Sequence, residues 1–129
     1  MTTGPRSLLE LENVHKRFGD VVANDEISLS VAPGEVVSML GENGAGKSTL
    51  MKITYGLVRA DSGSVRVEGK EIDLRSPRDA MKAGIGMVTQ EFSLVNTMTV
   101  AENISLSGIG FGNISANELR ANVLRVMDR

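Results

Sequence analysis

Apolar and polar residues alternate near the start of the chain in the manner of antiparallel strands. An apolar segment over residues 8–14 ends in a turn near Gly19, and a longer segment covers residues 21–31. Over residues 27–31 every second residue is apolar, and the residues between them are serines. A period of two is typical of a strand with one buried face. The pattern therefore predicts two strands separated by a turn.

A strand, a glycine-rich loop and a helix are predicted next. Residues 35–40 form a short, mostly apolar run that ends directly at Gly41, as expected of a buried strand that leads into a loop. After the loop, Leu50, Ile53 and Leu57 recur at helical spacing in a helix that is predicted to begin at Lys47.

The middle of the chain predicts several short elements. Residues 64–67 lie between turn signals and predict a small β meander that continues through residues 72–74. Pro77 fits the first position of a short helix, and Gly84 fits its end. Residues 85–88 then return to an apolar run and predict another strand.

Two capping boxes predict helices in the last part of the chain. Thr99 is followed three residues later by Glu102, and Ser115 in the same way by Glu118. A Gly-rich link at 108–112 separates the two helices, and residues 91–98 have no clear period. Strands followed by helices in this order indicate an α/β protein.

Composition and charge exclude several classes of function. The chain has 129 residues, 41% of them hydrophobic, which suits one compact domain at most. With no Cys and one His, disulfides and thiolate or His-rich metal sites are excluded. The net charge of −2 leaves no footprint for nucleic acid, so no nucleic-acid partner is expected. No apolar run is long enough to span a membrane.

Residues 41–48 match the complete phosphate-loop pattern G-x-x-x-x-G-K-[ST]. Glycines let backbone N–H groups approach phosphate oxygens, and the following helix N-terminus favours negative charge. Lys47 is placed to reach the β- and γ-phosphates, the Ser48 hydroxyl to ligate Mg²⁺, and Thr49 to add a further hydroxyl. Four fixed positions would arise by chance on the order of once in a hundred chains of this length. The phosphate-loop pattern alone does not distinguish between kinases, GTPases, motor ATPases and transporters.

Three segments together resemble the nucleotide-binding subunit of ABC transporters. They are residues 41–51, the Asp-Ser-Gly at 61–63 and the run at 84–90 that ends in Gln90. The resemblance extends from about Leu8 to the end of the chain. It implies a partial P-loop NTPase core with an antiparallel β subdomain over about residues 8–90. A Q-loop and the start of a helical subdomain would follow over about residues 91–129.

The resemblance also implies roles for individual residues. Phe18 matches the aromatic residue that stacks on adenine, although an aromatic residue can also belong to the core. Gln90 matches the glutamine that touches Mg²⁺ or the attacking water, although it could be an ordinary polar residue at a strand end. Lys47 and Gln90 would then be catalytic, and Ser48 and Gln90 would be the metal ligands. The nucleotide-binding set is Phe18, Gly41, Glu42, Asn43, Gly44, Ala45, Gly46, Lys47, Ser48 and Thr49.

The function implied by the resemblance is that of an energy-coupling subunit of an importer for simple sugars or nucleosides. Its cofactors would be ATP and Mg²⁺. Its partners would be transmembrane permease subunits, a second ATP-binding domain in the same chain or in a homodimer, and a solute-binding protein. The place implied is the cytoplasmic face of the cell membrane, with Phe92, Leu94 and Val95 in the docking groove. The alternatives are a soluble ABC-type ATPase without a membrane partner, and a nucleotide-binding module without turnover.

Several residues that hydrolysis in this family requires do not occur in the 129 residues. These are the Asp and Glu at the end of a second apolar strand, the Ser-Gly-Gly signature and the switch histidine. Residues 106–108 only resemble part of the signature, residues 123–128 are predicted to be helical, and His15 precedes the loop. We therefore expect the chain to be the front part of a longer ATPase.

Overall fold

The structure is a computed structural model, and it describes residues 7–89, 94–106 and 115–127. The chain divides into two compact units, Met1–Met87 and Val88–Arg129. Each unit is described by itself.

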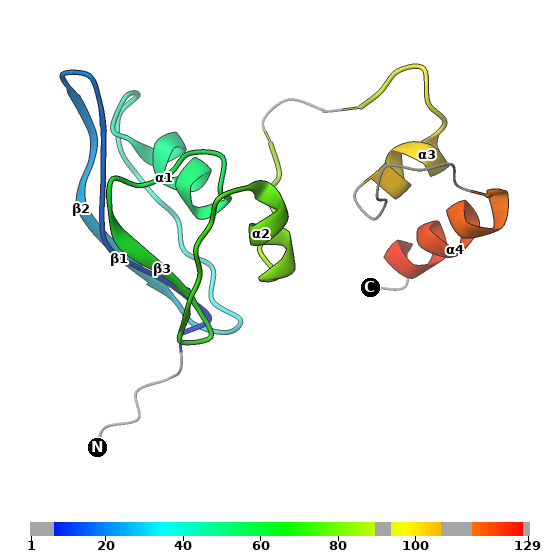
Figure 1. The fold of residues 1–129 in the computed structure, drawn as a ribbon, viewed down its shortest axis with the longest axis horizontal. Coiled ribbons are helices and arrows are strands. Elements are labelled where there is room, and N and C mark those ends of the chain that lie inside the picture. Colours follow the sequence, from blue (N-terminus) through cyan, green and yellow to red (C-terminus); the bar gives the residue numbers. More distant parts are fainter. Residues whose placement is uncertain (1–6, 90–93, 107–114, 128–129) are drawn as a thin grey trace. The chain divides into compact units, whose positions relative to one another are not determined.

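A four-stranded antiparallel sheet is the framework of the first unit (Figure 1). Its strands are β1 (Leu9–Phe18), β2 (Val21–Val31), β3 (Ser62–Val67) and β4 (Lys70–Glu71), in the order β2-β1-β3-β4. β1 and β2 form a hairpin in which Phe18 pairs with Val21 at the turn. The two strands predicted from the alternating pattern are confirmed.

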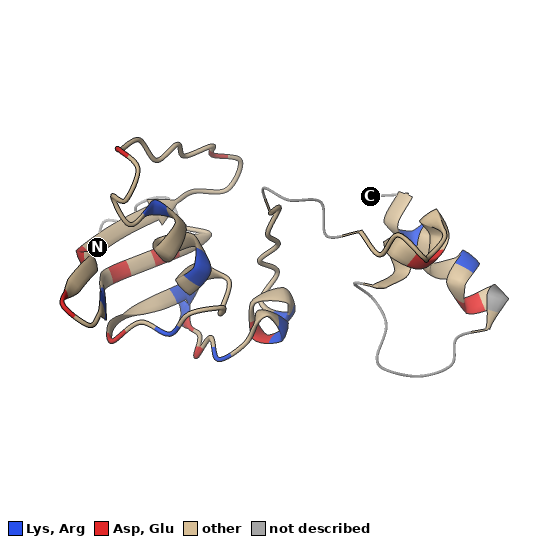
Figure 2. Cartoon of the chain, turned by 90° about the horizontal axis from the view of Figure 1, so that it is seen from above, with Lys and Arg blue, Asp and Glu red and all other residues tan. Residues whose placement is uncertain are grey.

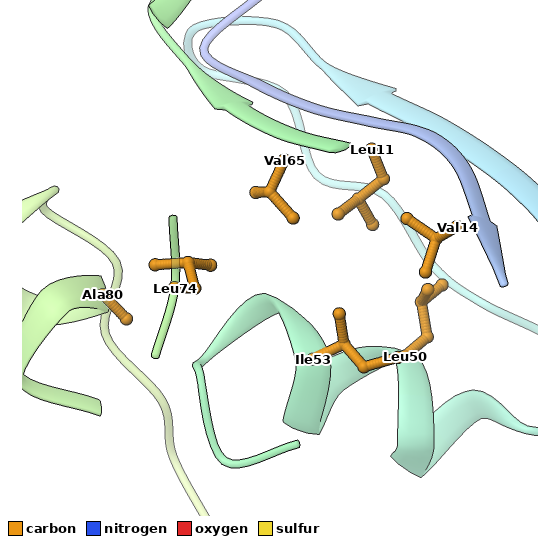
Figure 3. Close-up of a cluster of buried hydrophobic side chains, with 7 residues drawn as sticks. All are labelled: Leu11, Val14, Leu50, Ile53, Val65, Leu74 and Ala80. Carbon is orange, nitrogen blue, oxygen red and sulfur yellow. The ribbon is translucent and has the colours of Figure 1, made fainter. Parts of the chain in front are cut away.

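Two helices of this unit contribute side chains to its apolar core. They are α1 (Lys47–Thr54) and α2 (Pro77–Lys82). Side chains from β1, β3, α1 and α2 meet in one apolar cluster (Figure 3). Fully burying such side chains is worth about 1.5–3 kcal/mol each, so this cluster is the main stabilising feature of the unit. Its buried members are Leu11, Val14, Leu50, Ile53, Val65, Leu74 and Ala80.

A bulge in β1 brings the start of β3 unusually close. Asn13 has a φ of 48°, and the pairing of β1 with both neighbours shifts register around it. Opposite the bulge, Gly63 has a φ of 92°, and a Cβ there would lie 2.5 Å from the Asn13 carbonyl oxygen. Only glycine fits this contact, since real Cβ atoms do not approach a backbone oxygen so closely.

Two predicted strands are absent from the structure. Residues 35–40 and 85–88 are not paired with any strand in the described part of the chain. Several of their apolar side chains are strongly exposed, at 91% for Val36, 94% for Leu40 and 99% for Val88, whereas Met39 and Ile85 are partly buried against the core. A strand needs a neighbour for its N–H and C=O groups, and every strand in the described ranges lies in the antiparallel sheet. The prediction of buried strands was therefore wrong for these segments.

Two further boundaries differ from the predictions. The meander was expected to run through residues 72–74, but β4 ends at Glu71, and only a single bond from the Ile72 N–H to the Val65 carbonyl extends it. The helix predicted to reach Leu57 ends at Thr54, because Gly56 turns the chain with a φ of 74°. α2 has the predicted Pro at its start, and Gly84 follows its end.

The second unit contains α3 (Val100–Ser105) and α4 (Ala116–Met127). Both predicted capping boxes are formed: the Glu102 and Glu118 carboxylates accept bonds from the backbone N–H and hydroxyl of Thr99 and Ser115, respectively. Each hydroxyl in turn accepts a bond from the N–H of its glutamate, at 3.3 Å. Residues 123–127 are helical, as expected. Gln90, Phe92 and the link at 108–112 lie outside the described residues.

Candidate functional site

The phosphate loop is closed by its own lysine. The Lys47 ammonium donates to the carbonyl oxygens of Gly41 at 2.5 Å and of Glu42 at 2.7 Å. These bonds join the end of the loop to its beginning, and the N–H of Ala45 bonds the Glu42 carbonyl at 3.2 Å to form an inner turn. The loop thus holds a positive charge against its own backbone.

β2 determines where α1 begins. Gly46, the N-cap of α1, has a φ of 81°, and a Cβ there would lie 1.9 Å from the Ala23 carbonyl oxygen. The Asn24 side-chain amide, only 5% exposed, donates to the Gly46 carbonyl at 3.2 Å. The same carbonyl accepts from the Leu50 N–H at 2.9 Å as the first bond of the helix. Gly46 is therefore required by both its conformation and its contacts.

The start of α1 is open to an anion. The first N–H groups of a helix lack partners within the helix, and here no side chain caps them. The first turn contains no acidic residue, so no carboxylate within it offsets the partial positive charge of the helix dipole. Ser48 is exposed in this turn and Thr49 is half-buried. An uncapped helix start beside a lysine has the properties of a phosphate-binding site.

Ser48 is also a suitable ligand for a magnesium ion that accompanies phosphates. Mg²⁺ in nucleotide sites usually takes one or two protein oxygens and completes its shell with phosphate oxygens and water. Within the described ranges, no group of three or more His, Asp or Glu side chains could hold a metal. One exposed hydroxyl at the helix start fits the phosphate-dependent kind of site, with Ser48 as the protein ligand.

Phe18 ends β1 at the same end of the unit as the phosphate loop (Figure 1). Its partner Val21 begins β2, and two to three residues further along, at about 3.3 Å per residue, β2 touches Gly46. Phe18 is 49% exposed, and Val21 and Val22 beside it are 66% and 48% exposed. The ring therefore belongs to an exposed apolar surface near the loop rather than to the core.

Asp61 ties the loop before β3 to the end of β1. Its carboxylate accepts from the Lys16 ammonium at 2.7 Å and from the Arg17 N–H at 2.8 Å. These two bonds, the Lys16 bond foremost, hold the pKa of the Asp61 carboxyl below its ordinary value. Sequence reasoning treated Asp61 only as part of a turn and a family motif, and it missed Asn24 altogether. Asn24 is one of several polar residues in β2, beside Asp25 and Glu26, so no sequence signal singled it out.

The remaining described candidates are His15 in the first unit and Leu94 and Val95 in the second, while Gln90 and Phe92 lie outside the described ranges. His15 pairs with Asp25 at 3.1 Å on the surface, as expected of a surface histidine. Leu94 is 64% exposed and Val95 is 38% exposed in the second unit. Figure 2 shows that basic and acidic residues both occur on the strands and on the helices of the described chain.

The family follows from a comparison of the sequence with known families. A family model described as "ABC transporter" matches residues 24–129, which include the phosphate loop and all of the described helices. The chain belongs to the ABC transporter family. The resemblance seen in the three sequence segments is thereby confirmed.

Relatives within the ABC transporter family are named as import proteins. The chain is 55% identical over 106 residues to a glucose import ATP-binding protein, TsgD13, of Haloferax volcanii, covering 82% of this chain and 19% of that protein. It is 46% identical over 124 residues to a guanosine import ATP-binding protein, NupO, of Bacillus subtilis, covering 95% and 24%. The chain thus spans about a fifth to a quarter of the length of these relatives.

Solved ABC cassettes have the same fold. A nucleotide-free ATP-binding cassette from an ABC transporter matches with a TM-score of 0.73 at 36% identity, over 89% of this chain and 46% of that one. An ADP conformation of a cassette matches equally well, with a TM-score of 0.73, over 89% and 45%. The predicted fold class, a partial P-loop core with an antiparallel β subdomain, is confirmed. No described helix is both long and apolar enough to cross a membrane.

Proposed function

We propose that this ABC transporter family chain is the nucleotide-binding front part of the ATP-binding subunit of an importer. The observation that carries the proposal is the phosphate loop, in which Lys47 bonds the loop carbonyls beside an uncapped helix start. Such a site binds polyphosphate through backbone N–H groups, the helix dipole and one lysine.

Each predicted site residue has a part in this proposal. Residues 41–46 wrap the phosphates with their backbone, and Lys47 exchanges its bonds to the loop carbonyls for bonds to the β- and γ-phosphates. Ser48 ligates Mg²⁺ and Thr49 adds a hydroxyl. Phe18 stacks on the base, because its half-exposed ring lies at the loop end of the sheet. Gln90 touches Mg²⁺ or the attacking water.

Hydrolysis is a property that we assign to the whole protein. ABC family members use ATP hydrolysis for transport, and catalysis of phosphoryl transfer rests on positioning and on neutralising charge around the γ-phosphate. Lys47 supplies one such charge. The carboxylates that would activate water do not occur in these 129 residues, so for this chain we propose nucleotide binding.

The remaining parts of the proposal concern the assembled transporter. We propose permease subunits, a second ATP-binding domain and a solute-binding protein as partners, at the cytoplasmic face of the membrane. Simple sugars or nucleosides are the proposed solutes, because relatives are named for glucose and guanosine import. ATP would close two such domains together, and hydrolysis would reopen them.

The test is Mg²⁺-dependent ATP binding by the chain and by its Lys47→Ala variant, measured by calorimetry. We expect binding by the chain and at least a tenfold loss in the variant, since hydrogen bonds to charged groups are worth about 1.5–3 kcal/mol. Lys52→Ala is the matched control, because Lys52 lies exposed on the same helix. Equal binding by Lys47→Ala and the unchanged chain would refute the proposal.

A further inference from the structure

The ammonium group of Lys16 lies over the ring of Phe18. The Lys16 ammonium lies 5.2 Å from the ring centroid, within the range of a cation–π contact. The Lys16 side chain is only 15% exposed, so water screens its charge little. Lys16 and Phe18 are two residues apart on β1 and therefore lie on the same face of the strand.

Lys16 is itself held by a residue from a distant part of the chain. Asp61 is 45 positions away and accepts from the Lys16 ammonium at 2.7 Å. Its other carboxylate oxygen accepts from the Arg17 N–H at 2.8 Å, and its own N–H donates to the His15 carbonyl at 2.9 Å. Three consecutive residues of β1, directly before Phe18, are thus bonded to this one aspartate.

The segment that carries Asp61 has little freedom to move. Two residues later, Gly63 packs against the Asn13 carbonyl, in a contact that leaves no room even for a Cβ. Asp61 is ionised at neutral pH like any aspartate, and its bonds to Lys16 and to the Arg17 N–H lower its pKa further. A fixed anion therefore holds a cation over the ring.

We propose that Asp61 and Lys16 are positioning residues for the nucleobase. Lys16 covers one face of the Phe18 ring and restricts its rotation, which leaves the other face for a purine to stack on. The inference rests on the proposed function, since it assumes that ATP binds at the phosphate loop with its base at Phe18. Under this inference, the loop before β3, which carries Asp61, forms part of the nucleobase-binding site.

The experiment compares two ligands that differ only in the nucleoside. ATP and inorganic tripolyphosphate, each with Mg²⁺, are titrated into the chain and into Asp61→Asn. A cation–π contact of ordinary strength predicts ATP binding about two- to fivefold weaker in the variant and tripolyphosphate binding unchanged. Phe18→Ala should weaken ATP selectively too, and adding Asp61→Asn to it should cause no further loss.

The control variants distinguish base positioning by Asp61 from a purely structural role of that residue. They also distinguish failure of this inference from failure of the proposed function. Asp73→Asn removes an exposed pair with Arg75 at 2.6 Å and should change neither affinity. Lys16→Met removes the cation while leaving Asp61 its bond to Arg17, and it serves if Asp61→Asn does not fold. Unchanged ATP binding in both variants, or an equal loss for both ligands, overturns the inference. Failure of the unmodified chain to bind either ligand overturns the proposed function as well.

Discussion

β2 and residues 35–40 are two apolar stretches of the same unit with opposite outcomes. β2 pairs with β1 from Val21 to Val31, and its residues Ala23 and Asn24 contact the phosphate loop. Residues 35–40 lead into the same loop, yet they have no strand beside them in the described ranges, and Leu40 is 94% exposed. The difference lies in the availability of a partner, since both stretches have strand-like sequences.

The comparison shows that the contacts holding the phosphate loop come from the loop itself and from β2. Lys47 closes the loop by bonding Gly41 and Glu42, and Gly46 is anchored by β2. These contacts hold the loop in the conformation that the structure shows. The following predictions test both sides of this comparison, from the largest expected effect to the smallest.

The stability of the sheet that contains β2 depends on the apolar cluster between the sheet and α1. Ile53 is 2% exposed there, so Ile53→Ala should lower the free energy of unfolding by about 2–5 kcal/mol. Urea denaturation followed by circular dichroism measures the change. Leu57→Ala, at a position 52% exposed, should cost well under half as much. Similar losses in both variants would show that the cluster is not the main support.

The junction between β2 and the loop depends on Gly46. Gly46→Ala should cost about 1–3 kcal/mol from the positive φ alone, with an added clash against the Ala23 carbonyl. ATP binding should weaken more than tenfold, since the start of α1 must move. Gly69→Ala is the matched control: Gly69, in the turn between β3 and β4, also has a positive φ, of 78°, but nothing lies within 4 Å of the added Cβ. Equal ATP affinities in the two variants would contradict the role of β2.

The helix α3 needs no distant partner for its start, in contrast to the strands. Thr99→Ala removes the capping hydroxyl and should lower the stability of the second unit by about 1 kcal/mol. Thermal denaturation read at the helical circular dichroism band measures it. The control is Thr97→Ala, the same substitution two residues earlier and outside the capping box, and it should have a smaller effect. If the two variants lose the same stability, the capping box is not what holds the start of α3.

The capping boxes also predict a pH dependence. Bonds from Thr99 and Ser115 lower the pKa of Glu102 and of Glu118 below the ordinary value of 4.5. A lowered pKa in the folded state means that both contributions are present above pH 4.5 and are lost as the pH falls through the lower folded values. Helicity should therefore stay constant from neutral pH to about pH 5 and then decline. In Glu102→Ala/Glu118→Ala this acid-dependent step should shrink.

Substitutions in the unpaired residues 35–40 should have the smallest effect on stability and the largest effect on solubility. Val36→Lys and Leu40→Lys, at positions 91% and 94% exposed, should change the free energy of unfolding by less than about 0.5 kcal/mol. Because exposed apolar surface promotes association, the unmodified chain should self-associate and the double variant less so. Light scattering during heating measures this. A cooperative, monomeric transition of the unmodified chain would contradict the prediction.

The sequence by itself determined the elements whose signals lie within a few residues. The hairpin strands, α1, α2, both capping boxes and the phosphate loop were all predictable, because alternation, capping and the loop spacing involve near neighbours. The amino-acid sequence around the loop also indicated the family. Lys47 and Ser48 were predicted as ligands of phosphate and Mg²⁺ from the same local spacing, and these roles stay predictions.

Only the tertiary structure decided which apolar stretches pair with a neighbouring strand and which polar residues form hydrogen bonds with each other. Residues 35–40 and 85–88 have strand-like sequences, but pairing depends on segments far along the chain. The bond from Asn24 to Gly46 spans 22 positions, and that from Lys16 to Asp61 spans 45. No local pattern carries such contacts, because they follow from how the sheet brings distant segments together.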